Sequence, residues 1–284
     1  MTVCIAAIST ENEIIVAVDR KASSTEYSNE DATTKSAWVA PGWLCLFAGE
    51  DIAPVMPIVR RASKKLAEIL PSREDEEERF SLEEVTQAME SGYQEFLSDI
   101  CRAKVLSRWD FKTIKEFREH GRKQFGADEF DRMCMRIDEM RLKVTFLVCG
   151  IDEDGAPHIF TVSNPGVVEV RDEPGYWAIG NGGPAAMSLM SYFRQSIIKT
   201  LPETIYNVFA AKLMAQSASD VGENSFLWRL TKDGWDQGFP AFEHFQLVDK
   251  AWNEGGKPYV PRDALDEIKE LLKNPLSDSQ TSKD

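Results

Sequence analysis

The run Met1-Thr-Val-Cys-Ile-Ala-Ala-Ile8, followed after a short polar stretch by Ile14-Ile-Val-Ala-Val18, decides the fold of this chain. Both runs are apolar and rich in β-branched residues, and the residues between them are typical of a turn, so the sequence predicts a buried β-hairpin. The second strand ends on Asp19. A second predicted hairpin spans 37–47, turns at a Pro-Gly pair and is followed by Gly49.

Helical patterns follow the two hairpins. Apolar residues recur every three or four positions over 52–70, and again over 81–100, which opens with a Ser-x-x-Glu capping box. Residues 105–141 remain helical in period and highly charged. We therefore predict a helical insertion at 71–142, in which the charged run at 72–79 is an exposed linker.

Strand and helix patterns then alternate once more. The expected elements are strands at 144–149, 158–162 and 177–179, helices at 184–199 and 202–217, a strand at 225–230 and a short helix at 262–273. Two antiparallel sheets, covered by helices on both outer faces, would satisfy this order around one core. The sequence therefore predicts an α+β fold with four αββα layers. We expect one domain over 1–250, which contains the insertion, and a C-terminal helix with a disordered polar tail over 251–284.

The composition excludes several classes of function. The 284 residues carry a formal net charge of −14, which disfavours nucleic acid and anionic membrane as general partners. The chain has no apolar run long enough for a transmembrane helix, and its N-terminus lacks the basic region of a signal peptide. The five cysteines form no Cys-x-x-Cys pair, and Cys4, Cys45 and Cys149 lie in apolar runs, as expected for buried thiols in a reducing cytoplasm. The three histidines, His120, His158 and His244, lie far apart in sequence with no metal-ligand spacing, so we expect no zinc site. We also expect no cofactor.

Four residues near the N-terminus carry groups that fit nucleophilic catalysis. If Met1 is removed, Thr2 offers a hydroxyl together with a free α-amine, whose reference pKa of about 7.7–8.0 suits a general base near neutral pH. Lys35 would lower the effective pKa of that hydroxyl, and Asp19 would keep the lysine charged and oriented. The N–H of Gly49 would donate to an oxyanion. We expect Lys35 to serve chemistry more than packing.

The spacing of these residues points to a known family. Lys35 follows Asp19 by sixteen residues, and Gly49 follows Lys35 by fourteen. Later, Trp177-Ala-Ile-Gly-Asn-Gly-Gly183 forms a glycine turn before a predicted helix. In these features the chain resembles the proteasome β-subunit family of N-terminal-nucleophile (Ntn) hydrolases, and especially the HslV-type peptidases, over more than half of its length.

The resemblance implies a threonine peptidase in which Thr2 is the nucleophile. It also implies supporting roles for two residues near the N-terminal amine: Asn181 stands where the family has a serine, and Asp220 matches a second family aspartate. Glu223 departs from the pattern, because a serine is expected there.

The resemblance further implies how a substrate would bind. Ser23 belongs to the segment that lies beside the substrate channel in the family, and Phe47 stands at the family's main specificity pocket, where its ring would leave the pocket shallow. The implied substrate is a peptide or protein. The implied partners are further copies of the chain, closed into a homo-oligomeric ring, and an ATP-dependent unfoldase.

Two other functions fit the same fold. The chain could be a catalytically inactive structural subunit of such a ring, or an Ntn-type amidase of small molecules. A loose dinucleotide fingerprint, Gly180-x-Gly182-x-x-Ala185, is a weaker alternative, because it does not open the first β-α unit of the chain.

Overall fold

The computed structural model describes six stretches of the chain, which are 2–23, 28–29, 35–70, 79–218, 221–235 and 242–256. The chain forms two compact units, Met1–Ala241 and Phe242–Asp284. Within the second unit, the described residues form helix α7 (Phe242–Ala251) and the π-helical turn η4 (Trp252–Gly256). The predicted helix at 262–273, the polar tail and most of the predicted linker at 72–79 lie outside the described residues.

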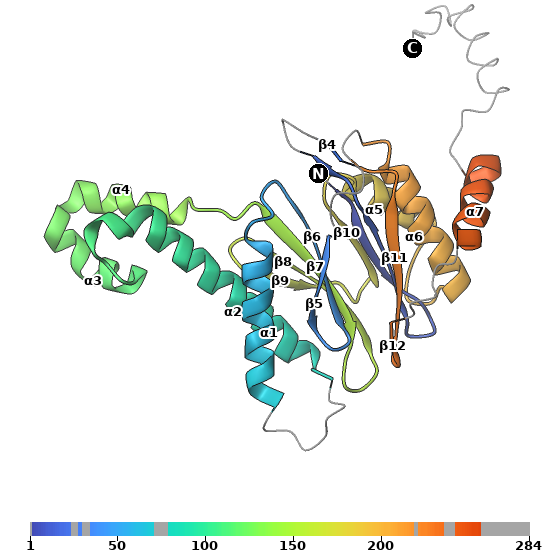
Figure 1. Cartoon of the computed structure of the whole chain (residues 1–284), viewed down its shortest axis with the longest axis horizontal. Helices are drawn as coiled ribbons and strands as arrows, with labels where there is room; N and C mark the ends of the chain where they lie inside the picture. Colours follow the sequence, from blue (N-terminus) through green and yellow to red (C-terminus); the bar gives the residue numbers. More distant parts are fainter. Residues whose placement is uncertain are drawn as a thin grey trace, which may run out of the picture. The chain divides into compact units, whose positions relative to one another are not determined.

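Two five-stranded antiparallel sheets form the centre of the first unit (Figure 1). The first sheet has the order β10-β1-β2-β11-β12, with β1 (Cys4–Ile8), β2 (Ile14–Asp19), β10 (Tyr176–Ile179), β11 (Ser225–Thr231) and β12 (Gly234–Trp235). The second has the order β5-β6-β7-β8-β9, with β5 (Ser36–Ala40), β6 (Trp43–Gly49), β7 (Val144–Ile151), β8 (Pro157–Ser163) and β9 (Val167–Val170). A separate short ladder joins β3 (Ala22–Ser23) to β4 (Ser28–Asn29). The two predicted N-terminal hairpins are confirmed as β1–β2 and β5–β6.

Helices of the first unit lie between these strands in sequence. They are α1 (Val55–Ile69), α2 (Leu82–Cys101), α3 (Ile114–Phe125), α4 (Ala127–Asp138), α5 (Gly183–Tyr192) and α6 (Leu201–Ala215). None of the helices in the described stretches is long and apolar enough to cross a lipid bilayer.

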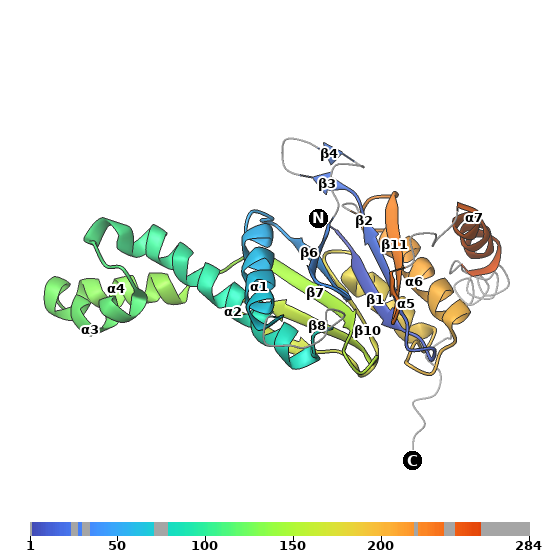
Figure 2. The same cartoon turned by 60° about the horizontal axis from the view of Figure 1, so that its bottom comes forward.

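Side chains alternate along β6 between two cores. Leu44 and Leu46 face the first sheet, where they pack with residues of β1 and β2 such as Val16. Trp43 and Cys45 face the opposite way and pack beneath α1 and α2. Helices α5 and α6 cover the outer face of the first sheet (Figures 1 and 2). The layers therefore run helix, sheet, sheet, helix, and the predicted α+β class with two antiparallel sheets is confirmed.

The start of α2 matches its sequence signal. The N–H of Glu84 donates to Ser81 Oγ at 3.3 Å, and the N–H of Ser81 donates to Glu84 Oε2 at 3.0 Å. These reciprocal bonds satisfy two backbone donors that the first helical turn would otherwise leave unpaired. The predicted capping box is confirmed.

The end of α5 does not match its sequence signal. The predicted helix runs over 184–199, but α5 ends well before that. The N–H of Gln195 donates to the carbonyl of Met190 at 2.9 Å, and the N–H of Arg194 donates to that of Ser191 at 2.9 Å. Arg194 has the left-handed φ of 52°. These features form a Schellman motif, which ends the helix. Its left-handed residue is Arg194 rather than the usual glycine or asparagine, so the residue types do not indicate the end of the helix.

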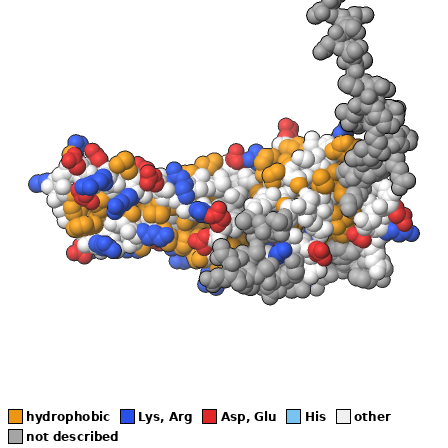
Figure 3. Space-filling view, turned by 90° about the horizontal axis from the view of Figure 1, so that it is seen from above, with side chains coloured by type: hydrophobic (Ala, Val, Ile, Leu, Met, Phe, Trp, Pro, Cys, Tyr) orange, Lys and Arg blue, Asp and Glu red, His pale blue; other side chains and the backbone are white. Residues whose placement is uncertain are grey.

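Helix α2 packs differently along its length. Its first half contacts the second sheet through Val85 and Tyr93. Leu97 contacts this core and also a smaller one, which is enclosed by α3, α4 and the turns η2 (Arg102–Leu106) and η3 (Ser107–Trp109). Helices α3 and α4, which we call the additional helices, therefore share a separate small core with the end of α2. Charged side chains of both signs lie on the surface of this part of the chain (Figure 3).

A histidine joins the β7–β8 hairpin to the segment after β9. His158 Nδ1 lies 2.7 Å from Asp172 Oδ2, and His158 Nε2 lies 3.0 Å from Asp152 Oδ2. The imidazole ring stacks on Trp43 with an interplanar angle of 4°. Partial burial acts to lower the pKa of His158, but the hydrogen bonds and charges of the two aspartates outweigh it, so the pKa is raised above its ordinary value.

We predict that His158→Gln destabilises the protein more at pH 5.5 than at pH 8.5. Because folding raises the pKa of His158, the stabilisation from its charged form is complete below the pKa of the unfolded chain, about 6.5, and is lost as the pH rises through the folded pKa. Urea unfolding of both proteins at both pH values measures the difference. His120→Gln, on the exposed side of α3, is the control for the loss of an imidazole that is not held between two aspartates. An equal loss at both pH values for His158→Gln would contradict the prediction.

Candidate active site

The β1–β2 hairpin places Asp19 beside the residues that precede β1. Cys4 pairs with Val18, so the register sets Val3 opposite Asp19. The N–H of Asp19 donates to the carbonyl of Val3 at 3.2 Å, and the N–H of Val3 donates to Asp19 Oδ1 at 2.8 Å. Asp19 is completely buried, and Thr2 keeps only 3% of its surface exposed. The hairpin register thus brings Thr2 and Asp19 together.

Lys35 reaches the same point from the other sheet. It directly precedes β5, and its carbonyl accepts a hydrogen bond from the N–H of Phe47 on β6 at 3.2 Å. Lys35 Nζ donates to Thr2 Oγ1 at 2.6 Å and to Asp19 Oδ2 at 2.9 Å. Because Lys35 is also buried, its ion pair with Asp19 lies where water screens charges only weakly. Three of the predicted site residues therefore converge where the two sheets meet.

The carboxylate of Asp19 is the centre of this cluster. Besides Lys35, it accepts a hydrogen bond from the hydroxyl of Thr2. It also accepts hydrogen bonds from three backbone N–H groups, those of Val3 (2.8 Å), Lys21 (3.2 Å) and Gly222 (3.2 Å). Both oxygens of this buried carboxylate are thus paired, as burial of a charge requires. The hydroxyl of Thr2 therefore donates a hydrogen bond to the carboxylate of Asp19 and accepts one from the ammonium group of Lys35.

A glycine turn between β10 and α5 holds the backbone of Thr2. The N–H of Gly182 donates to the carbonyl of Thr2 at 3.3 Å. Gly180 has a φ of 90°, and a Cβ there would lie 2.2 Å from the carbonyl oxygen of Thr2, so only glycine fits. The glycines predicted a turn, and the resemblance implied that Asn181 of this turn lies near the N-terminal amine. The sequence did not indicate that the carbonyl of Thr2 requires glycine at position 180. Because Thr2 fills the space beside Gly180, this turn is not open to the phosphates of a dinucleotide.

Gly49 ends β6 next to the same cluster. It pairs with Val144 of β7, and a Cβ on Gly49 would lie 2.1 Å from the carbonyl oxygen of Lys143, so the close approach of the strands by itself requires glycine. Successive N–H groups of a strand point to opposite edges. Since the N–H of Phe47 donates to Lys35, the N–H of Gly49 points to the edge of β6 on which Lys35 lies.

The other predicted site residues lie around this cluster or outside the described part of the chain. The side chain of Phe47 packs in the core beneath α1 and α2. Asn181 is exposed in the glycine turn, and Ser23 lies in the short β3–β4 ladder. Glu223 belongs to the segment that leads into β11. Asp220 lies outside the described residues.

Cys4 is a second potential nucleophile close to Thr2. Burial raises the pKa of the Cys4 thiol well above its ordinary value, and the negative charge of Asp19 raises it further. Cys4 Sγ donates a weak hydrogen bond to the carbonyl of Phe47 at 3.5 Å. Because only the thiolate is a strong nucleophile, the raised pKa disfavours the Cys4 thiol as a nucleophile at neutral pH.

The described stretches hold no cluster of metal-ligating side chains. Among those residues, no group of three or more His, Cys, Asp or Glu side chains could hold a metal ion.

No family model and no curated protein matches this chain.

Two cavities in the described part of the first unit lie away from this cluster. One, of about 540 Å³, lies between α2, α3 and α4, and another, of about 590 Å³, lies among the turns of the β1–β2, β7–β8 and β11–β12 hairpins. Neither has Thr2, Asp19 or Lys35 in its wall.

We predict that Lys35→Met lowers the free energy of unfolding by about 3 kcal/mol, because it leaves the carboxylate of Asp19 buried without its charged partner. The burial of this pair thus revises the expectation that Lys35 matters little for packing. Arg61→Met is a matched control, since it breaks a 2.7 Å ion pair to Asp99 whose side chains are 31% and 48% exposed, and should cost about 1 kcal/mol or less. Urea unfolding measures both losses, and equal losses would show that the Lys35 pair is not buried in solution.

We predict that Gly180→Ala is more destabilising than Gly155→Ala. Both glycines have a left-handed φ, of 90° and 81°, so alanine costs about 1–2 kcal/mol at either position. At Gly155 the new methyl group would meet nothing within 4 Å, whereas at Gly180 it would displace Thr2. Thermal unfolding of the two variants provides the comparison. Equal shifts in Tm would mean that the glycine turn does not hold Thr2.

Proposed function

We propose that this protein is an N-terminal threonine hydrolase of the proteasome β type, which cleaves peptide bonds with Thr2 as its nucleophile. The observation that carries the proposal is the 2.6 Å hydrogen bond from Lys35 Nζ to Thr2 Oγ1, made within the buried ion pair of Lys35 with Asp19. A hydroxyl is a weak nucleophile, and a neighbouring ammonium group favours its ionised form. Lys35 is in a position to provide this activation.

The proposed reaction begins once the bond between Met1 and Thr2 has been cleaved. The α-amine of Thr2 then takes the proton of its own hydroxyl, while the hydroxyl oxygen attacks the carbonyl carbon of the substrate amide. Lys35, oriented by Asp19, stabilises the charge on the attacking oxygen, and the N–H of Gly49 donates to the oxyanion. The intermediate collapses as the α-amine returns the proton to the leaving amine. Water then hydrolyses the ester on Thr2, and no cofactor is needed.

The architecture supports this proposal. The order helix, sheet, sheet, helix is the one expected of an Ntn hydrolase, and the cluster lies at the ends of β2 and β6, where the two sheets approach each other. We therefore also propose the Ntn fold. By resemblance to the proteasome β subunits, we propose a homo-oligomeric ring that encloses the sites and receives protein substrates from an ATP-dependent unfoldase.

We predict that a peptide epoxyketone adds once to the processed protein, at Thr2, as measured by intact mass. Thr2→Ala should prevent the adduct and lower the rate of peptide hydrolysis at least about a thousandfold, because the nucleophile is gone. Thr2→Ser should keep part of the rate, because the hydroxyl remains. Thr10→Ala, at an exposed position in the β1–β2 turn, is the control and should keep both adduct and rate.

One observation favours the structural subunit as a second candidate. Only 3% of Thr2 is exposed, and both hydrogen-bonding directions of its hydroxyl are used within the cluster. A protein that retains Met1 and forms no adduct, even when assembled, would support that candidate. A processed protein with no epoxyketone adduct, but with hydrolysis of small amides, would instead support the amidase.

A further inference from the structure

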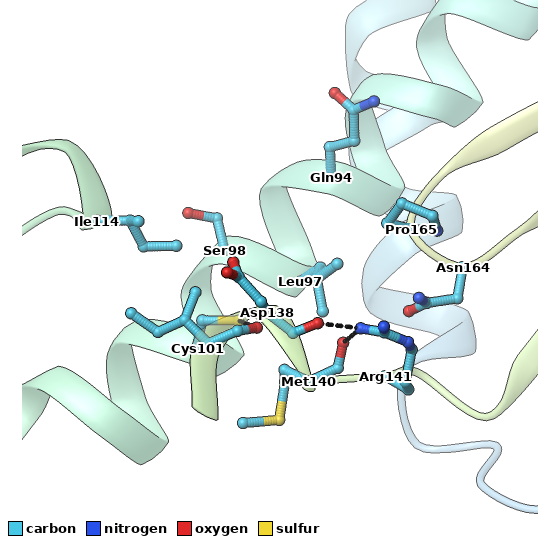
Figure 4. Close-up of a pocket in the computed structure, with 11 residues that line it drawn as sticks. Gln94, Leu97, Ser98, Cys101, Ile114, Asp138, Met140, Arg141, Asn164 and Pro165 are labelled. Carbon is cyan, nitrogen blue, oxygen red and sulfur yellow. Dashed lines mark hydrogen bonds between the residues drawn. The ribbon is translucent and has the colours of Figure 1, made fainter. Parts of the chain in front are cut away.

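The cavity of about 540 Å³ lies where the additional helices meet the sandwich (Figure 4). Its wall comes from α2, from the start of α3, from the end of α4 with the residues after it, and from the turn between β8 and β9. A volume of this size is typical of pockets that hold small molecules. The catalytic cluster contributes nothing to this wall, so the cavity is a separate place on the molecule.

One part of the wall is apolar. Leu97 of α2, Ile114 of α3 and Ile137 of α4 line the cavity, and each of them also packs in the small core of the additional helices. The thiol of Cys101 lies beside them, and burial raises its pKa, so it adds an uncharged surface. An apolar group in the cavity would contact all three helices at once.

The cavity also has hydrogen-bond donors at one end. Arg141 Nη1 donates to the carbonyl of Met140 at 2.9 Å and to that of Asp138, and Figure 4 shows the guanidinium group held between these carbonyls and Asn164. Both bonds use the same nitrogen, and the described residues provide no partner for Nη2 or Nε. Asn164 Oδ1 accepts the N–H of Leu142 at 3.0 Å, which orients its amide nitrogen as a second donor.

We propose that this cavity binds a small linear monocarboxylate of about eight carbons. The carboxylate would pair with the unused side of the Arg141 guanidinium group, whose planar fork matches two oxygens, and would also accept from the amide of Asn164. The alkyl chain would lie along Leu97, Ile114 and Ile137. Burial of its methylene groups would supply most of the affinity.

One negative charge of the wall opposes this ligand. Asp138 lines the cavity, but its side chain is 67% exposed and its Oδ1 lies 3.5 Å from Arg118 Nη2. Water and Arg118 together reduce its repulsion of an anion. The remaining polar side chains of the wall, Gln94 and Ser98, are uncharged.

The test is a titration of the full-length protein with octanoate, followed by NMR of its 13C-labelled isoleucine methyl groups. We expect saturable shifts at Ile114 and Ile137, with no shift at Ile159 in the core between the sheets. Hexanoate should bind about fifteenfold more weakly, since each buried methylene contributes about a factor of four. Arg141→Gln should weaken octanoate binding about tenfold, whereas Lys143→Gln, an exposed lysine outside the wall, should leave it unchanged.

Ser98→Phe provides a second variant, because Ser98 is exposed and lines the cavity, so a phenyl ring there would obstruct the space beside Leu97 without replacing a core residue. It should abolish the methyl shifts. The proposal is overturned if octanoate gives no saturable shift, if octanol binds as tightly as octanoate, or if either Arg141→Gln or Ser98→Phe binds octanoate normally. It is also overturned if acetyl-Gly-Gly-Leu binds more tightly than octanoate, which would assign the cavity to a peptide C-terminus. None of these results depends on Thr2 or on peptide hydrolysis.

Discussion

The buried ion pair between Asp19 and Lys35 is the interaction on which the rest of this structure depends. The two charges come from different sheets, and neither is tolerated in the core without the other. A shift of either strand by one residue would turn its charged side chain to the opposite face and leave the partner buried alone. The pair therefore favours one register of β2 and one position of the second sheet against the first. The same constraint places a polarised hydroxyl, that of Thr2, at the meeting point.

Rigid elements hold this point from several directions. Strand β2 carries Asp19, the lead into β5 carries Lys35, and the glycine turn after β10 fixes the carbonyl of Thr2. Backbone N–H groups complete the coordination of the carboxylate, including that of Gly222, which lies far away in sequence. A cluster supported in this way keeps the hydroxyl of Thr2 in one orientation. The net negative charge of the chain and the cavity among α2, α3 and α4 are separate features, and Thr2, Asp19 and Lys35 take no part in the wall of that cavity.

The parts of the fold that the sequence predicted are those governed by local periodicity. Strands β1, β2, β6 and β7 are apolar runs of a few residues bounded by turn residues, and α2 opens with a capping box that two side chains complete by themselves. The end of α5 was predicted wrongly because Arg194 adopts the left-handed conformation without being glycine or asparagine. The fixed spacings of Asp19, Lys35 and Gly49 anticipated the convergence of the first two. They did not reveal that Gly49 is required by the approach of β7, nor that Gly180 is required by Thr2.

By itself, the sequence determined the alternation of strands and helices, the buried character of the first hairpin and the chemical types available near the N-terminus. These properties follow from hydrophobic period and residue type, which act over a few neighbouring residues. Only the tertiary structure decided that Thr2, Asp19 and Lys35 share one buried point, that Phe47 faces a core, and that α2, α3 and α4 enclose a cavity with Arg141 at its end. Those outcomes depend on how the two sheets pack and on contacts between residues far apart in the chain. No local pattern encodes the distance between two such side chains.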